Sequence, residues 1–151
     1  MKLGEALIKR ADLQKKIGQL RARLGQNAKI QEGDEPAELI TNLLAEYDKT
    51  SSVLEKLIKR INRTNSATSF RGGTIIDSIV EGDSISAKIK TYRELYEAAI
   101  NKPERFGRLE IKYVKCVDVA MLQNQINDLS KDLRTLDIAL QECNWNTELL
   151  D

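Results

Sequence analysis

The sequence has no histidine, and only two cysteines and two prolines, among its 151 residues. Without histidine the chain has no Ser-His-Asp or Cys-His nucleophile, no His-ligated metal site and no imidazole that titrates near neutral pH. Cys116 and Cys143 cannot form a thiolate zinc site alone, and we expect both to be reduced. We therefore predict neither a metal nor a cofactor. Aromatic residues make up 5% of the chain and charged residues 31%, a balance that favours long helices over an aromatic-rich core.

Long apolar runs are missing as well. The N-terminal segment MKLGEALIKRADLQKKI carries a charge every few residues and lacks the apolar stretch of a signal peptide. No run approaches the roughly 20 apolar residues that a membrane helix needs. We therefore expect a cytoplasmic protein.

Apolar residues recur at intervals of three and four, which is the pattern of helices that pack against helices. The pattern predicts helices at about 2–24, 36–65, 75–101 and 118–143. The predicted fold class is all-α: one elongated unit over residues 1–151, with long antiparallel helices in a coiled-coil or four-helix-bundle arrangement. The residues predicted to form the helix–helix interface are Leu13, Ile17, Leu20, Leu54, Ile61, Ile126, Leu129, Leu133 and Leu136.

Local signals refine the helix ends. Pro36 suits the first position of a helix, Thr74 with Asp77 has the spacing of a capping box, and Asp118 is a good N-cap. Residues 109–117 instead alternate apolar and polar side chains and are rich in β-branched residues, so we predict a short strand there. Its expected partner is the 69–74 region or the same strand of a second chain.

Charge is arranged in blocks, although the formal net charge is only +1. The last predicted helix carries acidic residues toward its C-terminal end, where the helix dipole disfavours them, and a basic neighbour would offset this. The first helix is basic, so we predict that the first and last helices lie side by side. The net charges of successive blocks are +6 (1–30), −6 (31–55), +5 (56–71), −3 (72–87), +4 (88–115) and −5 (116–151).

One polar constellation is a candidate anion site. It combines a basic helix end with a glycine turn before a new helix N-terminus, where exposed N–H groups attract anions. Its residues are Arg60, Arg63, Arg71, Gly72, Gly73 and Thr74. The alternatives are that the arginines cap helix carbonyls while the remaining residues form a tight turn, or that the region contacts nucleic acid. We find no catalytic residues, because the paired carboxylates look like solvated helix faces.

Several segments resemble the bacterial septicolysin family: the N-terminal MKLGEALIKRADLQKKIGQL, the loop NAKIQEGDEPAE, and then INRTN, GGTIIDSI, EIKYVKCVDVAMLQNQI and QECNWNTEL. The resemblance implies a small helical protein, and the family name implies an oxygen-labile cytolysin. It brings no catalytic motif to particular residues. A critical thiol, if there is one, would have to be Cys116 or Cys143.

The leading hypothesis is a non-enzymatic, cytoplasmic coiled-coil protein that forms a homo-oligomer and acts as an interaction or scaffold module. Narrow apolar seams leave much helix surface to cover, which favours self-association over a monomer. One alternative is a membrane-active, cytolysin-like protein, as the resemblance implies. Another is binding of RNA or another polyanion through the Arg60–Arg71 region.

Overall fold

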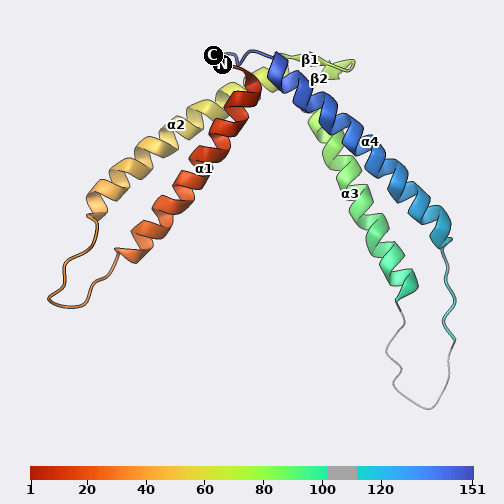
Figure 1. The fold of residues 1–151 in the computed structure, drawn as a ribbon, viewed down its shortest axis with the longest axis horizontal. Helices are drawn as coiled ribbons and strands as arrows, with labels where there is room; N and C mark the ends of the chain where they lie inside the picture. The colour runs from red at the N-terminus through yellow and green to blue at the C-terminus, as the bar shows by residue number, and fades with distance from the viewer. Residues whose placement is uncertain (102–111) are drawn as a thin grey trace.

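The computed structural model describes residues 1–101 and 112–151, and the description below concerns these residues. The elements are α1 (Leu3–Gln26), α2 (Ile40–Ala67), β1 (Ser69–Phe70), β2 (Gly73–Thr74), α3 (Ile75–Ile100) and α4 (Val119–Asn146). The all-α fold class is confirmed: four long helices account for most of the chain, and each pairs with an antiparallel neighbour (Figure 1).

The helices form two arms that diverge from a common apex, so the molecule has the shape of a V (Figure 1). Helix α1 packs along α2 in one arm, and α3 packs along α4 in the other. In each arm the odd-numbered helix lies on the inner side of the V (Figure 1). The bundle-like contacts therefore lie within each helix pair, and the two pairs meet only near the apex.

An apolar cluster at the apex joins the two arms. It contains residues from α1, α2, α3 and the C-terminal segment: Leu3, Ala6, Leu57, Ile61, Ile75 and Leu149. Burying each leucine or isoleucine of this cluster stabilises the fold by about 1.5–3 kcal/mol. A second cluster, built around Ile89, Leu122 and Ile126, lies within the α3/α4 arm.

The predicted pairing of the first and last helices is correct only at the apex. There the N–H of Leu3 donates to the carbonyl oxygen of Thr147 (2.9 Å), and Lys2 forms an ion pair with Glu148 (2.8 Å). The indole of Trp145 lies against Gly4. Along their lengths the two helices belong to different arms, because α1 packs on α2 and α4 packs on α3.

The predicted strand at 109–117 is wrong for residues 112–117, which contain no strand; residues 109–111 lie outside the described part. The β segment of the described chain lies at 69–74, where β1 pairs with β2 in the register Ser69↔Thr74 and Phe70↔Gly73. Arg71 and Gly72 form the turn with φ of 50° and 84°. Positive φ at both turn residues is typical of two-residue hairpins, so the 69–74 region pairs with itself.

The predicted helix starts at Thr74 and Asp118 are confirmed. The Asp77 N–H donates to Thr74 Oγ1 (3.4 Å), and the Met121 N–H donates to Asp118 Oδ1 (3.0 Å). The prediction that α2 begins at Pro36 is wrong, because the helix begins at Ile40. Residue Glu38 is instead held in the loop by Arg23 and by the Asn27 side chain, which accepts from the Glu38 N–H (3.1 Å).

Candidate functional site

The structure divides the predicted anion site into two separate groups, and the first comprises Arg60 and Arg63 on α2. Arg60 donates to the carbonyl oxygen of Leu150 (2.9 Å) and to the carboxylate of Asp151 (2.8 Å). Arg63 donates to the main-chain oxygen of Asp151 (3.0 Å). The Leu150 N–H also donates to the Thr64 hydroxyl (3.0 Å). Residues 150 and 151 therefore accept the hydrogen bonds that the two arginines would otherwise donate to an anion.

The second group forms the hairpin turn and the start of α3. Arg71 and Gly72 are the turn residues, and Gly73 belongs to β2. The Asp77 carboxylate accepts from the Thr74 hydroxyl (2.6 Å) and from the Thr74 N–H (2.8 Å). These two hydrogen bonds lower the pKa of Asp77, and the bond from the Thr74 hydroxyl has the larger effect. A side-chain carboxylate thus already lies at the N-terminus of α3, where a bound anion was predicted.

The predicted interface residues line the inner seams of the two arms. Leu20, Ile61, Ile126 and Leu136 are buried; Leu13, Ile17, Leu54, Leu129 and Leu133 are half-buried. Leu133 and Leu136 also lie near Gly82 of α3, where a Cβ would meet them at 3.8 and 3.5 Å. Gly82 therefore marks a position at which α3 and α4 approach closely.

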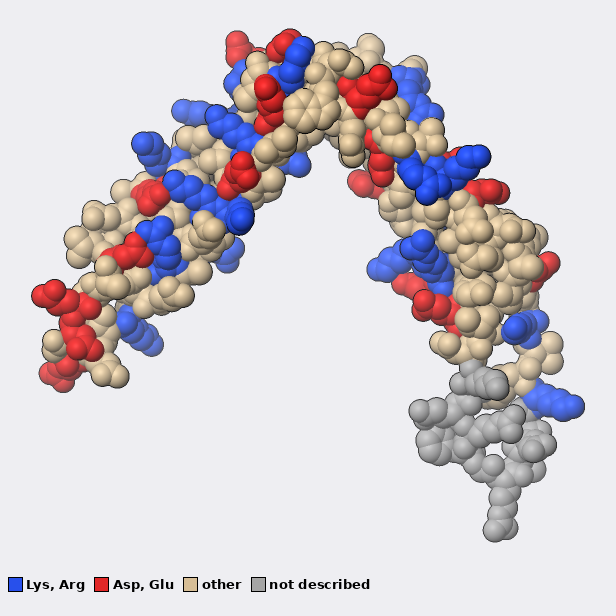
Figure 2. Space-filling view, viewed as in Figure 1, with Lys and Arg blue, Asp and Glu red and all other residues tan. Residues whose placement is uncertain are grey.

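The basic residues of α1 pair with a different acidic block from the one predicted, which was the last helix. The basic block of α1 contacts the acidic 31–55 block, through Lys16 with Glu46 (2.8 Å) and Arg23 with Glu38. The hydrogen bond from each base lowers the pKa of the glutamate that it contacts. The first contact joins α1 to α2 and the second joins α1 to the loop before α2; both are partly exposed and add little to the packing of the apolar seam. In Figure 2 both signs alternate along this arm, and acidic side chains gather at its tip.

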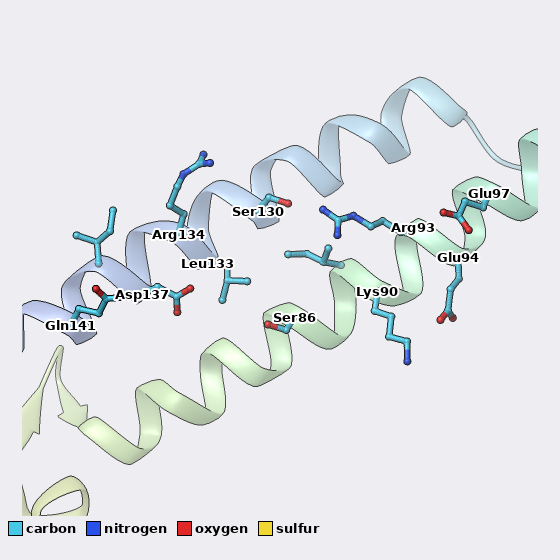
Figure 3. A pocket seen from close by; sticks show the side chains of 12 residues that line it. Ser86, Lys90, Arg93, Glu94, Glu97, Ser130, Leu133, Arg134, Asp137 and Gln141 are labelled. Atoms are coloured by element: carbon cyan, nitrogen blue, oxygen red, sulfur yellow. The ribbon is translucent and has the colours of Figure 1, made fainter. Parts of the chain in front are cut away.

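A groove of about 670 Å³ runs along one face of the α3/α4 arm (Figure 3). Its apolar part includes Ile89, Leu133 and the exposed Ile138, and Ser86 and Ser130 lie near its middle (Figure 3). Three basic and three acidic side chains line the remainder: Lys90, Arg93, Arg134, Glu94, Glu97 and Asp137. None of these six takes part in an ion pair within the described residues.

The apolar intervals that predict α3 mark the seam that packs on α4, and the pattern on the opposite face of the helix was missed. An outer stripe of seven exposed, uncharged residues runs along the helix: Ile76, Val80, Ser84, Ala87, Thr91, Leu95 and Ala98. The intervals are four, four, three, four, four and three residues, close to the helical repeat of about 3.6. This periodicity could have been found in the sequence, but the larger residues of the inner seam mask it.

Cys116 is exposed and Cys143 half-buried, and both are free thiols. Within residues 1–101 and 112–151, no group of three or more cysteine and carboxylate side chains is arranged to hold a metal ion. Among the described helices, none combines the length and apolar character that crossing a bilayer requires.

Residues 10–149 match the model of a "Family of unknown function (DUF6847)". The chain belongs to this family. It is also similar to the crystal structure of a functionally unknown conserved protein from Corynebacterium diphtheriae, with 36% sequence identity, 99% of each chain covered and a TM-score of 0.92. A search of the curated proteins gave no match. The resemblance to the septicolysin family is wrong, because neither the family match nor the similar structure indicates it.

Proposed function

We propose that this member of the family is a non-enzymatic, cytoplasmic coiled-coil protein that self-associates and serves as an interaction or scaffold module. The observation that supports this most directly is the outer stripe of α3. Ile76, Val80 and Leu95 on this stripe are 41%, 62% and 46% exposed. A helix that is apolar on more than one face is normally covered on more than one face, whereas α3 packs lengthwise only on α4.

Each arm is only two helices thick, which supports the same proposal. A pair of helices buries one seam, and the opposite faces of both helices stay in contact with water. Exposed large apolar side chains are more frequent on α3 than on α1 or α2: Ile76, Ile79, Val80, Leu95 and Ile100 on α3, against Ile8 on α1 and Leu44 and Val53 on α2. Exposed apolar surface that is rimmed by polar residues is typical of protein–protein contacts.

The two alternatives have less support. The membrane-active hypothesis depended on the septicolysin resemblance, which is wrong. Binding of a polyanion through the Arg60–Arg71 region would require Arg60 and Arg63 to exchange their contacts with Leu150 and Asp151 for phosphates.

Light scattering coupled to size-exclusion chromatography tests the proposal. The expected result is a mass that is a multiple of the 17.1 kDa chain and that falls on dilution. A mass of one chain at every concentration would overturn the proposal of self-association.

A further inference from the structure

The two stripes of α3 lie on nearly opposite faces of the helix. The inner stripe faces α4 and contains Ile75, Ser78, Gly82, Ile85, Ile89, Tyr92 and Tyr96, which are all buried or half-buried. The outer stripe lies on the face of α3 turned away from α4. Because α3 lies between α4 and the α1/α2 arm, this face is turned toward the space between the two arms (Figure 1). No described segment of this chain covers the centre of the outer stripe, since Ser84, Ala87 and Thr91 are all exposed.

The side chains of the outer stripe suit contact with another helix. Its central residues, Ser84, Ala87 and Thr91, are small, and the larger Val80 and Leu95 flank them. Small central residues allow two helix backbones to approach closely, while the larger ones fill the space on either side. The residues also form rows at intervals of four, and two helices that interlock such rows cross at about 50°.

The charges beside the stripe indicate the partner and its direction. Asp83 and Lys90 lie along one edge, and Glu81 and Lys88 lie along the other. In both pairs the acid precedes the base by seven residues. None of the four forms an ion pair in the described part of the chain. The midpoint between Asp83 and Lys90 falls next to Ala87, at the centre of the stripe.

A second copy of α3 that crosses antiparallel at Ala87 pairs charges of opposite sign. It places Asp83 of each copy beside Lys90 of the other, because the two positions are nearly equidistant from Ala87. Glu81 and Lys88 of the other copy lie on the same edge but about five residues apart along it, roughly 7.5 Å. A parallel two-fold contact would place each edge beside the opposite edge of the other copy, so Asp83 would lie near Glu81 and Lys90 near Lys88, which is unfavourable. The stripe is therefore complementary to itself in the antiparallel direction, as a two-fold symmetric contact requires.

We propose that this family member forms a two-fold symmetric dimer in which the outer stripes of two α3 helices cross antiparallel at Ala87. The inference depends on the self-association proposed above and specifies its surface and geometry.

The first test places a charge at the crossing point. The substitution Ala87→Glu puts two carboxylates together at the two-fold axis and should raise the dimer dissociation constant at least about tenfold. The matched control is Ala11→Glu, at an exposed alanine of α1 in the other arm, which should change it less than about twofold. Circular dichroism verifies that both variants keep their helices.

The outcomes separate the two proposals. If the unmodified chain is a monomer throughout, self-association itself fails. If it self-associates and Ala87→Glu weakens this no more than Ala11→Glu, then self-association stands and the α3 contact is wrong.

A charge-swap series tests the direction of the contact. Asp83→Lys and Lys90→Asp should each weaken the dimer, because each places like charges together across the antiparallel contact. The double variant should restore the affinity. In a parallel contact the single swaps would instead strengthen the dimer, since Asp83 would face Glu81 and Lys90 would face Lys88 of the other copy. Unchanged or stronger dimers from the single swaps, or no recovery in the double variant, would overturn the antiparallel arrangement.

Discussion

Each arm is a pair of antiparallel helices, but the two arms differ in how many of their charged side chains form ion pairs and in how much of their helix surface is covered. In the α1/α2 arm, basic residues of α1 contact acidic residues of the 31–55 block, as Lys16 does with Glu46. In the α3/α4 arm, the six charged residues of the groove form no ion pair within the described chain, and the uncharged outer stripe of α3 is uncovered. The comparison teaches that the first arm pairs more of its charges internally, and it directs the proposed contact between copies to the second arm.

The largest effect should come from the inner seams, where the arms should behave alike. Leu20 is 0% exposed in the first arm and Leu136 is 1% exposed in the second. Replacing either by alanine should lower the free energy of unfolding by about 2–5 kcal/mol, because each change leaves a cavity. Urea denaturation measures both. If the free energy of unfolding fell by only a small amount for Leu136→Ala and by a large amount for Leu20→Ala, the second arm would be less tightly packed than the first. The inner seams of the two arms would then not be alike.

A second prediction concerns the apex, where the arms join. A Cβ added to Gly4 would lie 2.8 Å from the Trp145 ring, whereas one added to Gly18 meets nothing within 4 Å. Gly4→Ala should therefore destabilise the protein by about 1–3 kcal/mol. Gly18→Ala should stabilise it by about 0.5–1 kcal/mol, because alanine is the better helix former. Melting temperatures that shift in the same direction would contradict the packing of Trp145 on α1.

The smallest effect should be the response of the first arm to acid. Hydrogen bonds from Arg23 and Lys16 lower the pKa of Glu38 and Glu46 below the ordinary value of a glutamate. A lowered carboxyl pKa contributes stability that is present above the ordinary value and is lost as the pH falls through the lowered one. The protection factor for amide exchange near Glu38 should therefore fall in that acidic range. Glu38→Gln should flatten this pH dependence, and an unchanged profile would argue against the Arg23 contact.

Local features of the sequence predicted much of the fold correctly. The four helices follow from apolar intervals of three and four, and the starts of α3 and α4 follow from the capping residues Thr74 and Asp118. The start of α2 did not follow from Pro36, because long-range contacts with Arg23 and Asn27 hold Glu38 outside the helix. The strand expected at 109–117 is absent from its described part, 112–117, for a related reason: alternation alone supplies no partner strand.

The candidate site was less predictable. Arg60 and Arg63 lie near Arg71 in the sequence and looked like one anion site, yet they contact residues 150 and 151, which are remote in sequence. The outer stripe of α3 was present as a pattern. It became informative only once the structure showed which face of α3 packs on α4.

By itself, the sequence determined the absence of histidine chemistry, the helical class, the lengths of the helices and most of their ends. These properties depend on residue type and on neighbours within one or two helical turns. The tertiary structure decided which helices pair, where the charge blocks meet, that the arms diverge from an apex, and which face of α3 stays uncovered. Those properties depend on contacts between distant residues, such as Leu3, Ile61 and Leu149 in the apical cluster, and no local pattern specifies them.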